Sequence, residues 1–509
     1  MFRHWKTQFT DTLFLHSVRL GLACMVCSGI VLFSGCHTYN LKVNKAREAF
    51  YCNNLESATT QIVEERKKPT NVKSRDVLKL EEAVMRMCQG EFRQSETLLR
   101  EVRDSFDALE NQNVQKGTEV AASMLTDDCS LSYRGEDYEK VMIRVMLALN
   151  SLMMDGADAR AYAHQINLKQ EEIISKSEVD PETNEKVKKS YKNLSIGPYI
   201  CGILDDNNVS AQQDQIREFS KVTQWSPNFA GGKELLERAR TSASSQKGNG
   251  NVYVFALVGH GPYKVETNAE VTQAALLVTD IIVSSTSKHS VPPTIAPVPI
   301  PCIHIAPCRY RSAKITVDGN TEPILTEKIT DINQIAIDQF EVNRPWIIAR
   351  AAARRLLKKA GIYGVKEAVS ADSWETELLL DIVGILWEGS EEADTRCWNL
   401  LPGSIQVARI ELPAGEHELK MAGTSQVFDP TERALQGATQ YVIQKMTSDF
   451  PTIPSQHTHR VWKKELLLGE TLNPQSCTLT VNVEDGRNTY VLVYFGDYGL
   501  VGTPHANTP

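Results

Sequence analysis

Cys302 and Cys308 have the spacing in this chain that most readily supports chemistry. Five residues lie between them, so a short loop could bring the two sulfur atoms together as a disulfide. His304 would add a metal ligand, but no set of cysteines and histidines here supplies four ligands at a known zinc spacing. The sequence therefore leaves a local disulfide or two free thiols open at this pair. It predicts no bound metal and no cofactor.

His260, Lys264 and Asp394 are the side chains from which a hydrolytic site would have to be built. The loop 259–264 lacks the spaced glycines and the Lys-Ser/Thr ending of a phosphate-binding loop. Residues 285–288 match Ser-x-x-Lys, but the supporting penicillin-recognition motifs are absent. The sequence also has no nucleophile elbow and no helix with the paired histidines of a zinc protease. An enzyme is therefore the second of two hypotheses for this chain.

Asp394, Arg396 and Trp398 lie close together between an expected helix and an expected strand. Such a cluster could bind a ligand. More often it holds a corner of the chain, where the carboxylate accepts hydrogen bonds from backbone amides and the guanidinium donates to carbonyl oxygens. The indole then fills the core. We predict a structural corner here.

An apolar run near the N-terminus ends at Cys36. Basic residues precede the run, residues 20–33 are uncharged and mostly apolar, and the small pair Ser34 and Gly35 comes directly before the cysteine. This order is typical of a secretory signal with its cleavage site. A signal-anchor helix is the alternative, but about 14 apolar residues fall short of the ~20 that span a bilayer.

Residues 32–36, Leu-Phe-Ser-Gly-Cys, resemble the lipobox of bacterial lipoproteins. The resemblance implies that residues 1–35 are a signal peptide that is removed and that the thiol of Cys36 is acylated. Several acyl chains would hold the mature chain stably at a membrane, whereas a single chain binds only marginally. His37 stands where an aspartate would retain an enteric lipoprotein in the inner membrane. We therefore expect an exported, membrane-anchored protein of the outer membrane that faces the periplasm.

The chain is acidic, with a formal net charge of −8 over 509 residues. Residues 1–35 carry three basic residues and one acidic residue, so the mature chain has a net charge of −10. An acidic body argues against nucleic-acid binding and against broad adhesion to anionic headgroups. Eight cysteines follow Cys36, which is too low a density for a disulfide-stapled fold. The length predicts roughly two to four domains.

Residues 36–240 show the apolar period of amphipathic helices. Turn residues recur between these helices, each ahead of an apolar and a small residue, at Asn53, Gly90, Gly135, Gly156 and Asn208. The first two corners lie 37 residues apart, near the ~34-residue period of the tetratricopeptide repeat. We predict tetratricopeptide-like repeats that bind protein or peptide partners, with a generic antiparallel bundle as the alternative.

Residues 241–251 are rich in Ser, Gly and Asn and are predicted to form a flexible linker. Residues 252–401 then combine strands and helices in a mixed α/β domain, and residues 402–509 form a small antiparallel β-rich module. The module is expected to contain two hairpins, which pair 405–410 with 418–421 and 478–483 with 490–495.

Three helices are expected in the mixed domain. Asp331 caps the first, Pro345 starts the second, and the third covers residues 374–387. The second helix carries Arg350, Arg354, Arg355, Lys358 and Lys359. It could face a membrane or an anionic partner. We favour a packed helix with a solvated basic edge, since basic residues are placed favourably near a helix C-terminus.

Taken together, these features resemble a family of uncharacterised, tetratricopeptide-containing lipoproteins of Gram-negative bacteria. The resemblance covers nearly the whole mature chain and rests on residues 331–336, 350–354, 394–402 and 412–415, in that order. It implies the location and architecture described above. It implies no activity, cofactor or catalytic residue.

The sequence therefore predicts an α+β multidomain protein. Its expected function is that of a non-enzymatic envelope lipoprotein, a scaffold for protein partners in cell-wall or outer-membrane assembly. The alternative is a hydrolase of envelope polymers with its site near His260, Lys264 and Asp394.

Overall fold

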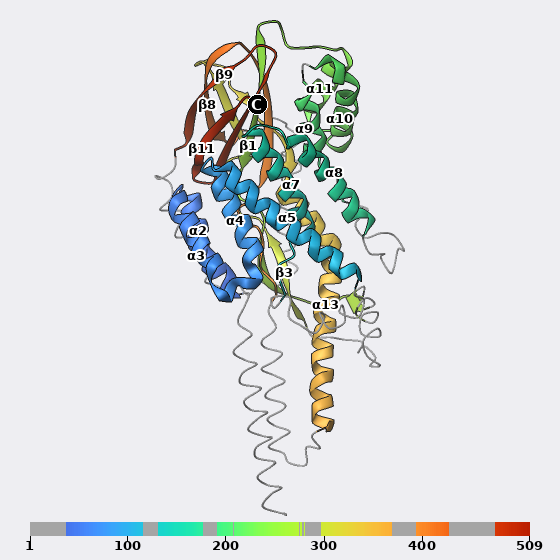
Figure 1. Ribbon diagram of the computed structural model, residues 1–509. Helices are drawn as coiled ribbons and strands as arrows, with labels where there is room; N and C mark the ends of the chain where they lie inside the picture. Colours follow the sequence, from blue (N-terminus) through green and yellow to red (C-terminus); the bar gives the residue numbers. More distant parts are fainter. Residues whose placement is uncertain are drawn as a thin grey trace, which may run out of the picture.

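The computed structural model describes residues 37–115, 131–176, 191–206, 208–273, 275–276, 279, 297–368, 393–426 and 474–509. The signal peptide, Cys36 and the expected helix 374–387 lie outside these described residues. The fold is α+β, as predicted, with helices covering one side of a layered β structure (Figure 1).

The N-terminal helices follow one another as a chain of neighbours, which we call the helical array. Each helix packs chiefly against the one before it and the one after it. The array consists of α2 (His37–Tyr51), α3 (Leu55–Lys67), α4 (Arg75–Cys88), α5 (Phe92–Gln115), α7 (Asp137–Leu152), α8 (Ala159–Ser175), α9 (Ile196–Leu204), α10 (Gln212–Trp225) and α11 (Ala230–Arg240), with the 3-10 turns η1 (Pro69–Ser74) and η4 (Val209–Ala211).

Four of the five predicted corners turn through a left-handed backbone conformation, at Asn53 (φ 58°), Gly90 (φ 80°), Gly135 (φ 67°) and Gly156 (φ 70°). The glycine at position 135 is also required by packing, because a Cβ there would lie 2.4 Å from the Phe106 ring. The fifth corner, after Asn208, is instead the 3-10 turn η4.

The strands form one mixed sheet of five strands and two smaller antiparallel sheets. The large sheet has the order β11 (Gly499–Asn507), β10 (Asn488–Gly496), β1 (Asn249–Val258), β7 (Ser404–Pro413) and β6 (Glu327–Asp331). The second has the order β5 (Ile324–Leu325), β4 (Ser312–Val317), β8 (Gly415–Thr424) and β9 (Ser476–Val483), and the third pairs β2 (Tyr263–Ala269) with β3 (Val298–His304).

The large sheet is the middle layer of three. Val252, Val254 and Ala256 of β1 point into a core shared with the four-stranded sheet. The alternate residues Tyr253 and Phe255 point into the core of the helical array. Successive side chains of a strand face opposite sides, so β1 reads as a continuous apolar run because both of its faces are buried.

The predicted boundary at residues 401 and 402 does not separate two domains. Strand β1 pairs antiparallel with β7 and parallel with β10, so the expected mixed domain and the expected C-terminal module share one sheet. The two predicted hairpins are also wrong. Each joins a strand of the large sheet to a strand of the small one, β7 to β8 and β9 to β10. A corner between stacked sheets has the same alternating pattern and turn residues as a hairpin.

Helix α13 (Ile332–Ala368) replaces two predicted helices. Asp331 caps it as predicted, since its Oδ1 accepts a hydrogen bond from the Gln334 amide at 3.0 Å. The helix continues through Pro345, which removes only one helical hydrogen bond. Ile348 and Ala349 beyond the proline are buried against the β2–β3 pair, and this packing explains the continuation. Among the described residues, no helix is both long and apolar enough to cross a membrane.

The predicted linker is held in place by hydrogen bonds. Its last residues already belong to β1, which begins at Asn249. The Gly248 amide donates to Asp485 Oδ1 at 2.9 Å, and the Gln246 amide donates to Glu411 Oε1 at 2.7 Å. Two carboxylates of the β structure therefore fix a segment whose composition suggests flexibility.

Candidate functional site

Residues 394–401, here called the clamped segment, lie against the inner side of the helical array. Arg396, whose side chain is 2% exposed, donates through Nη1 to the carbonyl oxygens of Lys73 and Leu131, both at 3.0 Å. Its Nε and Nη2 contact the Asp394 carboxylate at 2.9 and 2.7 Å. Burial alone would raise the pKa of the Asp394 carboxyl, but the charge of Arg396 outweighs burial and lowers it. This pair is therefore charged at neutral pH.

Two buried carboxylates of the array bind the backbone of the clamped segment. Glu81 of α4 accepts the Leu400 amide at 3.0 Å and the Asn399 amide at 3.3 Å. Glu139 of α7 accepts the Trp398 amide at 2.8 Å. Both glutamates are 0% exposed. Three consecutive amides thus donate hydrogen bonds to carboxyl groups on two different helices of the array. Burial raises the pKa of both carboxyl groups, and at Glu81 the charge of Arg47 acts against this shift.

Glu81 also forms a buried ion pair with Arg47 of α2, at 2.8 Å between Oε1 and Nη2. The Trp398 side chain is 0% exposed within the core of the array. The Asp394, Arg396 and Trp398 contacts are those expected of a structural corner. The polar side-chain groups of Asp394 and Arg396 are engaged with the chain itself, whereas the buried Trp398 Nε1 has no hydrogen-bond partner among the described residues.

The three residues of the hydrolase hypothesis are paired with other groups. The His260 ring stacks on Tyr51, with centroids 3.7 Å apart, and its Nε2 lies 3.1 Å from Asp497 Oδ2. Lys264 forms an ion pair with Glu136. Asp394 is close enough to Lys264 to influence it electrostatically, but His260 is coupled to Asp497 instead.

Lys264 is also unsuited to act as a base. Burial would lower the pKa of its ammonium group, but the negative charges around it, that of Glu136 first, outweigh burial and raise the pKa. A catalytic lysine base needs the opposite shift, towards neutral pH. The arrangement around Lys264 therefore stabilises a permanent positive charge.

Of the two alternatives left open for Cys302 and Cys308, the structure has the two free thiols and not the disulfide. Cys302 lies on β3, where its Sγ contacts the Ile303 carbonyl oxygen at 3.7 Å, while the Cys308 thiol donates to the Tyr310 carbonyl oxygen at 2.8 Å. Strand β3 stays extended through His304 and carries Cys302 along the β2–β3 pair, whereas Cys308 turns towards Asp497. Although the Cys308 residue is exposed, desolvation at its sulfur and the nearby Asp497 carboxylate raise the pKa of the thiol.

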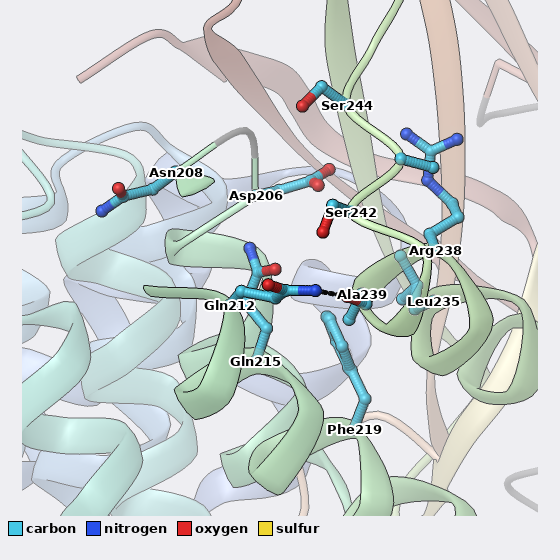
Figure 2. Close-up of a pocket in the computed structure, with 11 residues that line it drawn as sticks. Asp206, Asn208, Gln212, Gln215, Phe219, Leu235, Arg238, Ala239, Ser242 and Ser244 are labelled. Atoms are coloured by element: carbon cyan, nitrogen blue, oxygen red, sulfur yellow. Dashed lines mark hydrogen bonds between the residues drawn. The ribbon is translucent and has the colours of Figure 1, made fainter. Parts of the chain in front are cut away.

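A small polar cavity lies where the last helices of the array meet the loop that leads to β1 (Figure 2). Its volume of about 20 Å³ is enough for a water molecule. Asp206, Ser242, Gln212 and Gln215 are among the residues that line it, and Gln212 donates to the Ala239 carbonyl oxygen at 2.9 Å.

Asp206 connects this cavity to the large sheet. Its Oδ2 accepts hydrogen bonds from Asn251 at 2.9 Å, from Arg409 at 3.4 Å and from the Tyr253 hydroxyl. The Asp206 carboxylate therefore links the end of α9 to strands β1 and β7 of the large sheet. A second cavity of about 20 Å³ lies between α7, α8 and α13. Neither cavity is lined by His260, Lys264 or Asp394.

Sequence reasoning missed Glu81 and Glu139, the carboxylates that hold the clamped segment. One signal was present in α4, where Glu81 lies one helical turn from the buried apolar residues Val77, Leu78, Val84 and Met85. A charge at such a position needs a partner, because an unpaired buried carboxylate is strongly destabilising. The pattern identifies neither Arg47, which is the charge partner of Glu81, nor the Asn399 and Leu400 amides, which lie more than 300 residues away.

In the part of the chain that the structure describes, no three His, Cys, Asp or Glu side chains gather in a way that could hold a metal ion. No family model matches this chain, and no curated protein or solved structure shows significant similarity to it.

Proposed function

We propose that this protein is exported, acylated on Cys36 and held at the outer membrane facing the periplasm, where it acts as a non-enzymatic scaffold for other envelope proteins. The lipobox-like residues 32–36 support the tether. The serial packing of the helices and their left-handed corners support tetratricopeptide-like repeats.

The observation that carries the proposal is the clamped segment. The helical array holds residues 394–401 of its own chain through their backbone amides, the Arg396 guanidinium and the buried Trp398 indole, and a peptide partner would be held by the same kinds of contact. Of the residues of the hydrolase hypothesis, Lys264 and Asp394 form ion pairs and His260 lies against Asp497. None of them lines either of the two cavities described above. Since the inner side of the array is occupied, protein partners would contact its outer faces or the β layers.

The mechanism is local concentration. A lipid anchor confines the binding surfaces to one membrane, which raises their effective concentration towards other tethered partners without any new contact. On the basis of this proposed location, we propose a role in cell-wall or outer-membrane assembly.

The test is a pull-down from crosslinked cell envelopes that compares the intact chain with a Cys36→Ala variant. The intact chain is expected in the membrane fraction, with defined envelope proteins crosslinked to it, and the variant is expected to lose both. Mass spectrometry of the purified protein should show an N-terminus at Cys36 with added lipid. Soluble fractionation of both chains with no envelope protein recovered would end the proposal.

A further inference from the structure

Helix α13 carries a concentration of positive charge that contrasts with the rest of the protein. Between Arg344 and Lys366 the sequence has seven basic residues and no acidic one, whereas the whole chain has a net charge of −8. Such a cluster on an acidic protein needs a specific explanation, because general adhesion to anionic surfaces is opposed by the charge of the body.

The first part of α13 is explained by packing. Ile348, Ala349 and Ala352 are buried against β2 and β3, and Arg355 donates to the Pro297 carbonyl oxygen at 2.7 Å. The first part of α13 is therefore the packed helix with a basic edge that the sequence favoured. Residues 357–368 continue the helix, which projects away from the body of the molecule (Figure 1). This projecting part carries three of the seven basic residues, Lys358, Lys359 and Lys366, together with the acidic Glu367.

The projecting part points to the end of the molecule where the membrane anchor would be. Helix α2 begins at His37, directly after Cys36, and its last turn lies at the large sheet, where Phe50 contacts Tyr494 with ring centroids 5.5 Å apart. The N-terminal end of α2, which follows Cys36, is therefore the end of this helix that lies farther from the large sheet. Helix α13 likewise starts beside the sheet, where the Ile332 amide donates to the Gly403 carbonyl oxygen at 2.9 Å, and runs away from it towards the same end (Figure 1).

We propose that the projecting part of α13 binds the anionic lipid headgroups of the membrane to which Cys36 is anchored. This inference rests on the proposed tether for its biological setting. Each basic residue near an anionic surface strengthens binding about fivefold. With the rest of the body acidic, the contact would be confined to this helix. It would hold the helical array and the β layers in a fixed orientation above the membrane.

The test uses the mature chain produced without residues 1–35, which is therefore not acylated. Its binding is measured by co-sedimentation with vesicles of phosphatidylcholine alone and of phosphatidylcholine with about a third phosphatidylglycerol, at ~0.1 M salt. We expect binding to the anionic vesicles only. The double variant Lys358→Glu/Lys359→Glu should lose at least tenfold in affinity, and so should the unaltered chain at ~0.5 M salt.

The matched control is Lys233→Glu/Arg240→Glu, which makes the same charge change at two exposed positions of α11, a helix at the other end of the molecule. It should bind the anionic vesicles like the unaltered chain. If Lys358→Glu/Lys359→Glu fails to fold by circular dichroism, Lys358→Gln/Lys359→Gln replaces it, with a smaller loss expected.

Equal binding to both vesicle types, no binding to anionic vesicles, or equal losses in the α11 and α13 variants would overturn the inference. The inference would also be overturned if the basic residues of α13 bound an acidic protein and not anionic lipid. These outcomes are separate from the proposed tether. A missing acyl group on Cys36 would be detected by mass spectrometry and would leave the vesicle result unchanged.

Discussion

At the scale of single residues, the main feature is the burial of ionisable side chains that contact an opposite charge or backbone hydrogen-bonding groups. Glu81 and Glu139 are 0% exposed and Arg396 is 2% exposed, yet each contacts opposite charge or several backbone groups. A buried pair gives little net stability compared with apolar packing, but breaking it leaves one uncompensated charge and is costly. These residues therefore determine where the clamped segment lies.

We expect Glu81→Gln to lower the free energy of unfolding by about 3–5 kcal/mol, because Arg47 would remain buried without its counter-charge. Urea unfolding followed by circular dichroism measures this loss. The control is Glu101→Gln, which also breaks an ion pair, that of Lys79 at 3.1 Å, but at a carboxylate whose side chain is 51% exposed. Its cost should be about 1 kcal/mol or less. Similar losses in the two variants would contradict the role given to Glu81.

Two histidines should affect stability in opposite directions as pH changes. Burial at the contact between β11 and the α4–α5 corner lowers the pKa of His505, although the Cys88 carbonyl partly counteracts it. A hydrogen bond to Asp318 raises the pKa of His417. His505 thus contributes stability that is present above about pH 6.5 and is lost as pH falls through its lowered pKa. The contribution of His417 is present below about pH 6.5 and is lost as pH rises through its raised pKa.

The measurement is the free energy of unfolding at pH 5 and pH 7.5, extrapolated from urea titrations. His505→Asn should reduce the loss of stability at pH 5 relative to the unaltered chain, and His417→Asn should increase it. The same direction of change in both variants would show that these assignments are wrong.

At the scale of elements, the close approach of strand β11 to helix α4 determines how the large sheet packs against the helical array. Gly502 of β11 has φ 73°, and a Cβ there would lie 2.2 Å from the Cys88 carbonyl oxygen at the end of α4. The edge of the large sheet can meet the helical array only because this position has no side chain.

Gly502→Ala should therefore cost about 3 kcal/mol or more, from backbone strain and from overlap with α4 together. Gly486→Ala is the matched control, because Gly486 has φ 71° and no atom of the described residues lies within 4 Å of where its Cβ would be. It should cost about 1 kcal/mol from strain alone. Thermal unfolding of the two variants compares them directly, and equal melting temperatures would contradict a tight contact between β11 and α4.

At the scale of the whole molecule, the helical array and the large sheet share one core. Phe50 of α2, Tyr253 of β1 and Trp398 of the clamped segment belong to the same buried cluster. The predicted separation of residues 36–240 from the rest therefore does not describe the packing, since the array would expose this apolar surface without the sheet.

We expect the mature chain to unfold in a single cooperative transition, with far-UV circular dichroism and tryptophan fluorescence changing together. A chain of independent domains would give two transitions. Separate midpoints for the two signals would show that the helical array is stable without the β layers.

The local features of this protein follow from its sequence. The amphipathic helices, the left-handed corners at Gly90 and Gly135, the cap at Asp331 and the apolar strand β1 each depend on contacts between residues that are near in the chain. The lipobox-like residues 32–36 also belong to this local level, and acylation of Cys36 remains a prediction.

Only the tertiary structure decided which elements meet. Hairpins and corners between sheets share one sequence pattern, so the pairing of β1 with β7 and β10 could not be deduced from alternation. Similarly, the sequence places a charge at Glu81 but does not identify Leu400 as the amide it binds, because long-range contacts depend on burial shared by distant segments. The direction in which α13 projects is set by the same packing.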